Sequence, residues 1–108
     1  MLEIVCVALA VYFESRGESE EGQRAVASVV WNRLEDPRWP SNACKVVTQP
    51  NQFAVLSEPT DAKAWQKAVL AAKDAKITRN TEAVFFATPG HHLSRTYLET
   101  IGNHEFFK

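Results

Sequence analysis

The chain has 108 residues, of which 45% are hydrophobic and 23% charged, and its formal net charge at pH 7 is −1. This size and composition are typical of a single globular domain spanning residues 1–108, and they exclude collagen-like and disordered classes. The basic residues are scattered rather than gathered in a stripe, so we expect no nucleic-acid partner.

The first predicted element is a largely buried helix over residues 2–16. Its longest apolar run, Ile4–Phe13, is about half as long as a membrane-spanning helix must be, so we expect no membrane span. The run does not have the flanks of a signal peptide either, because Glu3 precedes it in place of a basic residue and no small-residue cleavage site follows. Gly17 is suited to cap the end of this helix.

A second helix is predicted from Ser19, a favourable N-cap residue, to about Leu34. One side of this helix carries alanine and valine residues at helical spacing. Gln23 begins on that apolar side. A polar amide in such a position requires a hydrogen-bonding partner.

The middle of the chain is predicted to be irregular and to lead into a third helix. Four prolines between Glu35 and Pro59 exclude a long regular element, although Lys45–Thr48 is predicted as a short strand. Irregular stretches of this length often line a binding site. The third helix is predicted to begin at Thr60, with an inner face formed by Ala64, Trp65, Ala68, Val69 and Ala72.

The last part of the chain is predicted to be β-structure. Residues 82–87 form a candidate strand, and a loop follows at 89–92. Residues 96–101 and 104–107 then flank Gly102-Asn103, a plausible two-residue hairpin turn. The predicted fold class is therefore α+β, with three main helices followed by a short antiparallel sheet.

The two cysteines, Cys6 and Cys44, allow at most one disulfide. Cys6 lies inside the apolar first helix, where a free thiol behaves as a small core residue. We therefore expect two reduced thiols in preference to a bridge.

The densest cluster of unusual residues is 12–18 (YFESRGE). Glu14 closes a mostly apolar helix and follows two aromatic residues. An apolar setting and the negative end of a helix dipole both predict a raised pKa for this carboxyl, as a general acid requires. The competing interpretation is an exposed glutamate or one paired with an arginine, and the local pattern alone favours it.

Residues 12–18, together with 22–33 (GQRAVASVVWNR), resemble the signature of the SleB/CwlJ cell-wall hydrolase family. Further segments resemble that family in the same order along the chain: 39–40 (WP), 44–47 (CKVV), 52–53 (QF) and 101–107 (IGNHEFF). The resemblance implies a small α+β catalytic domain with a lysozyme-like active-site layout. It also implies that Glu14, the first glutamate of the family's E-A-R-G-E motif, is catalytic.

Two positions depart from the family pattern. Ser15 replaces the usual alanine of the motif, which is a small change. Leu93 stands where the family often has a tryptophan, so one contact that would stack on the substrate is not expected here.

The function implied by the resemblance is cleavage of peptidoglycan strands between N-acetylmuramic acid and N-acetylglucosamine, by a lytic transglycosylase that uses Glu14 as its only acid/base. One alternative is a hydrolytic muramidase in which Glu18 is a second carboxylate, since ordinary glycosidases use such a pair. Others are a zinc amidase using His91, His92, His104 or a cysteine, and a wall-binding module that has lost the reaction.

Candidate substrate-binding residues lie in the matched segments. The amides can bond to sugar groups or, equally, to the backbone. Phe53 is more typical of a core residue, Glu18 of a capping residue or a partner of Arg16, and His104 of a structural residue at the hairpin. The predicted set is Tyr12, Glu18, Gln23, Asn32, Gln52, Phe53 and His104.

We expect no cofactor and no metal, because the adjacent His91 and His92 seldom chelate one ion and no third ligand has zinc-site spacing. Both histidines are predicted to be exposed to solvent. The expected partner is the peptidoglycan glycan strand, and we expect a monomer. Because no export signal is visible, a phage endolysin released from the host cytoplasm to the cell wall is the setting we expect.

Overall fold

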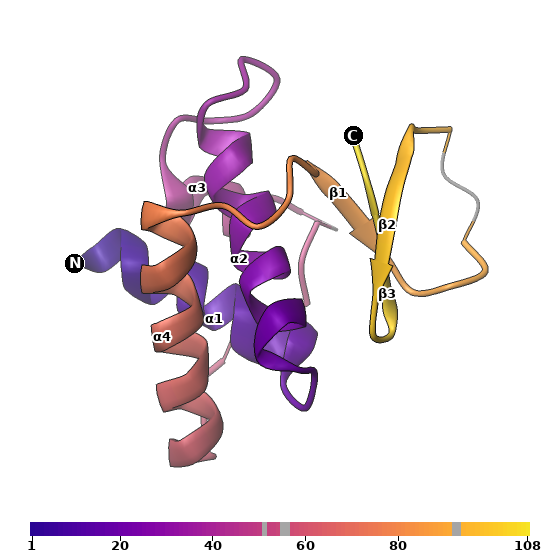
Figure 1. The fold of residues 1–108 in the computed structure, drawn as a ribbon. Helices are drawn as coiled ribbons and strands as arrows, with labels where there is room; N and C mark the ends of the chain where they lie inside the picture. Colours follow the sequence, from indigo (N-terminus) through magenta and orange to yellow (C-terminus); the bar gives the residue numbers. More distant parts are fainter. Residues whose placement is uncertain (51, 55–56, 92–93) are drawn as a thin grey trace.

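The computed structural model describes residues 1–50, 52–54, 57–91 and 94–108. In these residues four helices precede a three-stranded antiparallel sheet, which confirms the α+β fold class (Figure 1). The helices and strands, in chain order, are α1 Leu2–Ser15, α2 Glu20–Leu34, α3 Ala43–Val47, α4 Ala62–Ile77, β1 Phe85–Ala87, β2 Tyr97–Ile101 and β3 His104–Phe107.

The core lies where α1, α2 and α4 pack against one another, and it is built mainly from alanine and valine. Small side chains let these helices approach closely, and Trp31 of α2 adds a hydrogen bond from its indole Nε1 to Ala72 O of α4 at 3.0 Å. The predicted N-cap is confirmed, since Ser19 Oγ accepts from Gly22 N at 3.1 Å. Gly17 follows the end of α1 with a positive φ of 93°, a conformation that suits glycine.

The predicted strand at residues 45–48 is wrong, because residues 45–47 belong to the short helix α3 and Thr48 is its C-cap. Asn42 caps that helix by accepting from Lys45 N at 3.1 Å. The two valines are buried against α1 and α2. Capping and tertiary burial here outweigh the strand preference of β-branched residues, which depends strongly on context.

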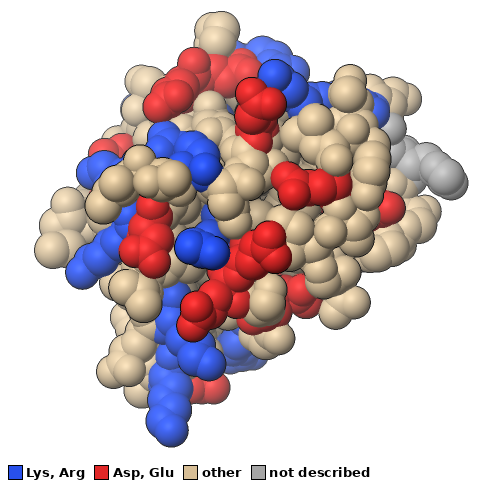
Figure 2. Space-filling model, in the orientation of Figure 1, with Lys and Arg blue, Asp and Glu red and all other residues tan. Residues whose placement is uncertain are grey.

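The helix predicted from Thr60 begins two residues later, at Ala62. Its N-cap is Asp61, whose carboxylate accepts from Ala64 N at 3.0 Å. Among the described residues no helix is both long and apolar enough to cross a membrane. Figure 2 shows acidic and basic side chains interspersed over one face of the molecule, rather than a single basic stripe.

The sheet has the strand order β1-β3-β2, so the last strand lies in the middle. The predicted hairpin is confirmed: β2 and β3 pair around the Gly102-Asn103 turn, where Gly102 has a φ of 58°. The strand predicted at 82–87 is confirmed only for Phe85–Ala87. The sheet lies to one side of the helices, and β1 contacts α2 (Figure 1).

The expectation of two free thiols is wrong, because Cys6 and Cys44 form a disulfide. The bridge joins α1 to α3 through two cysteines that lie 38 residues apart in sequence. Only the packing of α3 against α1 brings the two cysteines together. Helical periodicity could not have revealed this pairing, since it carries no information on contacts between elements.

Candidate active site

An open groove of about 340 Å³ runs between the end of α1 and the sheet. Elements far apart in sequence meet there, because β1 and β3 are held beside the helices. Its described lining residues are Glu14, Gln52, Phe86, Ala87, Thr88, His91 and His104.

Glu14 stands at this groove in the last turn of α1 and is half-buried. Its Oε1 accepts a hydrogen bond from the backbone N of Ala54 at 2.6 Å. Its Oε2 forms no hydrogen bond to a described residue. Among the described lining residues Glu14 is the only carboxylate. The described lining of this open groove therefore provides one carboxylate, on Glu14, beside two histidines.

Two further predicted residues, Gln52 and His104, line the same groove. Gln52 is exposed, and its Oε1 accepts from Arg33 Nη1 at 3.3 Å. His104 is only 5% exposed and packs edge-on against Phe86, with ring centroids 5.2 Å apart. Its Nδ1 has no hydrogen-bond partner among the described residues. Gln52 can thus contact a ligand directly, whereas His104 forms part of the groove wall.

Phe53 does not appear among the groove residues and packs against the core instead. Its ring centroid lies 6.1 Å from that of Phe86 and 5.4 Å from the guanidinium carbon of Arg33. These contacts match the core role that its residue type favours.

Tyr12 is turned away from the groove, contrary to its predicted role as a sugar contact. It is 1% exposed, and its hydroxyl accepts from the backbone N of Thr60 and of Asp61 at 3.2 and 3.1 Å and from Arg16 Nη1. Burial alone would raise the pKa of the phenol, but these donors outweigh it and the pKa lies below its usual value. Tyr12 therefore fastens the start of α4 to α1.

Replacing Tyr12 with phenylalanine is expected to cost stability and to spare activity. Tyr12→Phe leaves two backbone N–H groups without their acceptor, which should lower the free energy of unfolding by about 1–3 kcal/mol. Thermal denaturation measures the loss, and lysis of purified cell walls below the melting temperature measures activity. A variant that melts normally and fails to lyse would instead place the hydroxyl in the reaction.

Glu18 does not serve as a second groove carboxylate, since it is not among the lining residues. Its carboxylate accepts from Asn103 N at 3.0 Å and from Asn103 Nδ2 at 3.2 Å, so it holds the β2–β3 turn. Gly102 has a positive φ of 58°, which favours glycine in this turn, and a Cβ added there would displace the Glu18 carboxylate. Arg16, its predicted partner, bonds to Tyr12 instead.

We expect Glu18→Gln to cost about 1 kcal/mol of stability, because a neutral amide replaces a carboxylate that accepts two charge-assisted hydrogen bonds from Asn103. The rate of glycan cleavage should stay within about threefold of that of the parent chain. Loss of a catalytic acid, base or nucleophile would lower the rate far more. Steady-state lysis rates and a melting curve check both statements. A loss of activity of a hundredfold or more would restore Glu18 as a catalytic carboxylate.

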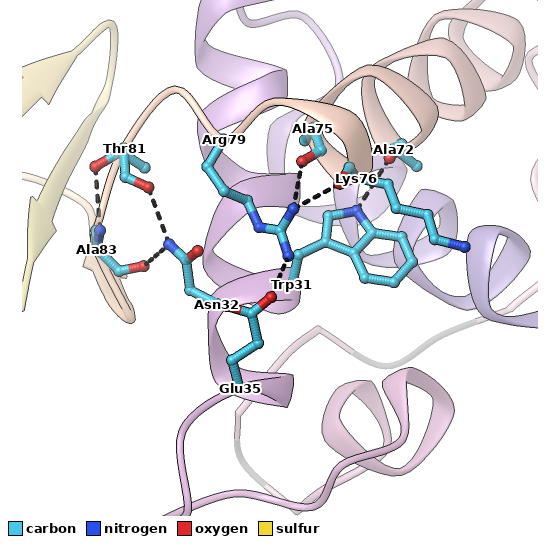
Figure 3. Close-up of polar contacts among 9 residues, drawn as sticks. All are labelled: Trp31, Asn32, Glu35, Ala72, Ala75, Lys76, Arg79, Thr81 and Ala83. Atoms are coloured by element: carbon cyan, nitrogen blue, oxygen red, sulfur yellow. Dashed lines mark hydrogen bonds and ion pairs between the residues drawn. The ribbon is translucent and has the colours of Figure 1, made fainter.

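Gln23 and Asn32 are both committed to structural hydrogen bonds and lie outside the groove. Gln23 is 5% exposed and donates from Nε2 to Glu18 O at 3.1 Å, which is the partner that its apolar position requires. Asn32 donates from Nδ2 to Thr81 O and Ala83 O, both at 2.9 Å (Figure 3). Their contribution to the site is therefore indirect.

Figure 3 shows how the connection between α4 and β1 is fastened to α2. Asn32 holds the backbone just before β1, while Arg79 bonds to Ala75 O and Lys76 O at the end of α4 and to Glu35 Oε1 at 3.1 Å. This anchoring sets where β1 begins and thereby places Phe86 at the groove.

Sequence reasoning did not single out Phe86, Ala87 and Thr88 as groove residues, and it considered His91 as an exposed loop residue or, in the zinc amidase alternative, as a metal ligand. His91 is indeed exposed, and it also lines the groove. The adjacent aromatic pair Phe85-Phe86 in a predicted strand was an available signal, because neighbouring strand residues point to opposite faces, so the two rings cannot pack on the same face of the sheet. His92 and Leu93 lie outside the described residues.

In the described part of the chain no group of three His, Cys, Asp or Glu side chains converges. Both cysteines are held in the disulfide. The ligand set that a zinc amidase would need is therefore not assembled by these residues.

Comparison with known proteins shows the family. The cell wall hydrolase family matches residues 17–107, a segment that begins just after Glu14. The spore cortex-lytic enzyme of Halalkalibacterium halodurans is 35% identical over 112 residues, which cover 96% of this chain and 34% of that relative. The chain thus spans about a third of the length of that curated relative.

Solved structures are similar over nearly the whole chain. The catalytic domain of the Bacillus cereus SleB protein superposes with a TM-score of 0.83 and 29% identity, covering 98% of this chain and 89% of that one. The catalytic domain of the germination-specific lytic transglycosylase SleB from Bacillus anthracis gives a TM-score of 0.80 at 29% identity, covering 98% and 93%. By fold and by sequence, this chain belongs to the SleB/CwlJ family of cell wall hydrolases.

Proposed function

We propose that this chain cleaves the glycan strands of peptidoglycan between N-acetylmuramic acid and N-acetylglucosamine, with Glu14 as a single general acid and then base. The observation that carries this proposal is one carboxylate at an open groove in a cell wall hydrolase fold. The similarity to a protein named as a lytic transglycosylase supports the reaction type.

The hydrogen bond from Ala54 N to Glu14 Oε1 suggests where the acidic proton resides. An N–H donor favours an unprotonated oxygen, so the proton belongs on Oε2. From there it passes to the glycosidic oxygen as the bond to C1 of the muramoyl residue breaks. The resulting carboxylate takes the proton of the C6 hydroxyl, whose oxygen bonds to C1 and closes a 1,6-anhydro ring. No water is consumed.

A hydrolytic muramidase is the second candidate, in which Glu14 would instead activate water. Two-carboxylate glycosidases hold their pair at about 5–9.5 Å across the scissile bond. Glu18, the carboxylate considered for that role, is bonded to the β2–β3 turn. The single-carboxylate route therefore has the better structural support.

The substrate of the proposed reaction is the cell wall, and the disulfide bears on how the protein reaches it. Disulfides persist in oxidising compartments and are rare in the cytosol. The Cys6–Cys44 bridge therefore favours action outside the cell membrane. Release as a phage endolysin remains compatible with this, provided that the bridge forms after release.

Product analysis on purified peptidoglycan tests the proposed function. A lytic transglycosylase should yield muropeptides with 1,6-anhydromuramic ends, whereas a muramidase yields reducing ends that are heavier by one water. Mass spectrometry separates the two. An amidase would release free peptides, and a binding module would release nothing, so either result would refute the proposal.

A further inference from the structure

A second depression of about 380 Å³ adjoins the groove. Gln52 lines both, so the two meet at this residue, while Phe85 in the depression and Phe86 in the groove project from opposite faces of strand β1. We call it the arginine–aromatic depression, after its lining residues Arg38, Trp39, Gln49, Pro50, Gln52, Phe85 and Arg95. No step of the cleavage reaction proposed above uses it.

A buried cation lies beneath this depression. Arg33 is 4% exposed, and its guanidinium carbon lies 4.9 Å from the ring centroid of Trp39 and 5.7 Å from that of Phe85. Its Nε donates to Val84 O at 2.8 Å and its Nη1 to Gln52 Oε1. Burial, with a smaller contribution from Arg38, lowers the pKa of Arg33 to about 10, so it remains a cation at neutral pH. Among the described residues no carboxylate forms an ion pair with it.

The rim adds a second cation, Arg95, which has no carboxylate partner among the described residues. Arg95 is exposed and lies over the ring of Phe85 at 4.4 Å, and its only side-chain hydrogen bond within the described residues is to Ser94 O. Arg38, by contrast, is paired with Asp36 at 2.8 Å. Three arginines and one aspartate therefore meet around two aromatic rings, and the local charge is positive.

The lining is also incomplete in hydrogen bonds. Gln49 Oε1 is buried and has no partner among the described residues. Buried polar atoms without a partner are uncommon, and a ligand is one way to supply it. An N–H group of a ligand could donate a hydrogen bond to Gln49 Oε1. A carboxylate of the ligand could pair with the arginines, because guanidinium groups bind carboxylates through two parallel hydrogen bonds.

We propose that the arginine–aromatic depression binds the acidic peptide branch of the glycan strand that occupies the adjoining groove. A peptide offers both required groups, a backbone N–H for Gln49 and a side-chain or terminal carboxylate for Arg95 above the buried charge of Arg33. Its aliphatic atoms can cover Trp39 and Phe85. This inference rests on the proposed function, because the peptide reaches the depression only when attached to a bound strand.

The test measures binding, so that it does not depend on cleavage. Glu14→Gln protein is applied to immobilised glycan strands of three kinds: strands with native peptides, strands whose peptide carboxyls have been converted to amides, and strands stripped of peptides, which keep the lactyl carboxylate on the sugar. The same three surfaces are used for Glu14→Gln carrying Arg95→Gln. Glu14→Gln carrying Lys73→Gln is the control, since it removes one exposed charge from α4, outside both the groove and the depression.

We expect the Kd to rise about tenfold when native strands are replaced by amidated or stripped ones. A change of this size corresponds to the loss of one hydrogen-bonded charge pair. Arg95→Gln should raise the Kd on native strands by a similar factor and leave it unchanged on amidated strands, because both changes remove the same interaction. Lys73→Gln should bind all three surfaces as Glu14→Gln does.

Equal binding to native and amidated strands would overturn the proposal, as would an equal loss by Arg95→Gln on every surface. Full binding to stripped strands would show that no group of the peptide is needed for binding and would also overturn it. The proposed function is judged separately, by whether the parent chain cleaves the same strands. A parent chain that binds in the expected pattern without cutting would refute only the cleavage reaction.

Discussion

Glu14→Gln is expected to lower the rate of glycan cleavage at least a hundredfold and to leave the fold intact. A positioned general acid typically contributes a factor of 10²–10⁴, and glutamine cannot supply the proton. The hydrogen bond from Ala54 N can still be accepted by the amide oxygen. Because Glu14 is half-buried at the rim of an open groove, the isosteric change creates no cavity.

The measurement is the initial rate of release of soluble muropeptides, with a melting curve for each variant. Glu18→Gln is the matched control, since it makes the same change four residues later on a carboxylate that holds the β2–β3 turn. Glu14→Gln should melt within about 2 °C of the parent chain, because surface substitutions rarely change stability by more than about 0.5 kcal/mol. Near-normal cleavage by Glu14→Gln would refute the assignment of Glu14.

Removing the disulfide should produce the largest loss of stability. The Cys6–Cys44 bridge closes a long loop between α1 and α3, and such bridges typically contribute about 2–4 kcal/mol. For a domain of this size the double variant Cys6→Ser with Cys44→Ser should melt about 10–20 °C lower. Well below that temperature its cleavage rate should equal that of the parent chain, because neither cysteine lines the groove.

A reducing agent is the internal control for that experiment. The parent chain in excess dithiothreitol should melt near the temperature of the double variant, and the variant itself should not respond to the reagent. If dithiothreitol leaves the parent melting temperature unchanged, the bridge does not form in solution. In that case the disulfide would no longer bear on where the protein acts.

Much of the local structure could be predicted from local sequence. The apolar run Ile4–Phe13 predicts a buried helix, Ser19 predicts the start of the next, and Gly102-Asn103 predicts the hairpin. These features depend on periodicity, capping and turn geometry, which involve residues close together in the chain. The family resemblance, carried by the motif around Glu14, likewise required only the order of residues.

The roles of some candidate site residues could be predicted and those of others could not, because local sequence does not show which way a side chain points in the folded chain. Residue type shows that Gln23 needs a hydrogen-bond partner and that Phe53 is typical of a core, and the structure agrees. Residue type cannot show where a side chain points. Tyr12 and Asn32 are chemically able to bind a sugar, yet their polar atoms are used by α4 and by the backbone before β1.

What the sequence by itself determined is the three long helices, the N-cap at Ser19, the C-terminal hairpin with its turn, and the family to which the chain belongs. The tertiary structure alone decided that Cys6 meets Cys44, that residues 45–47 are helical, and that Glu14 faces β1 across an open groove. The physical reason is that local preferences act between near neighbours. Contacts between α1, α3 and the sheet arise only when the whole core is buried together.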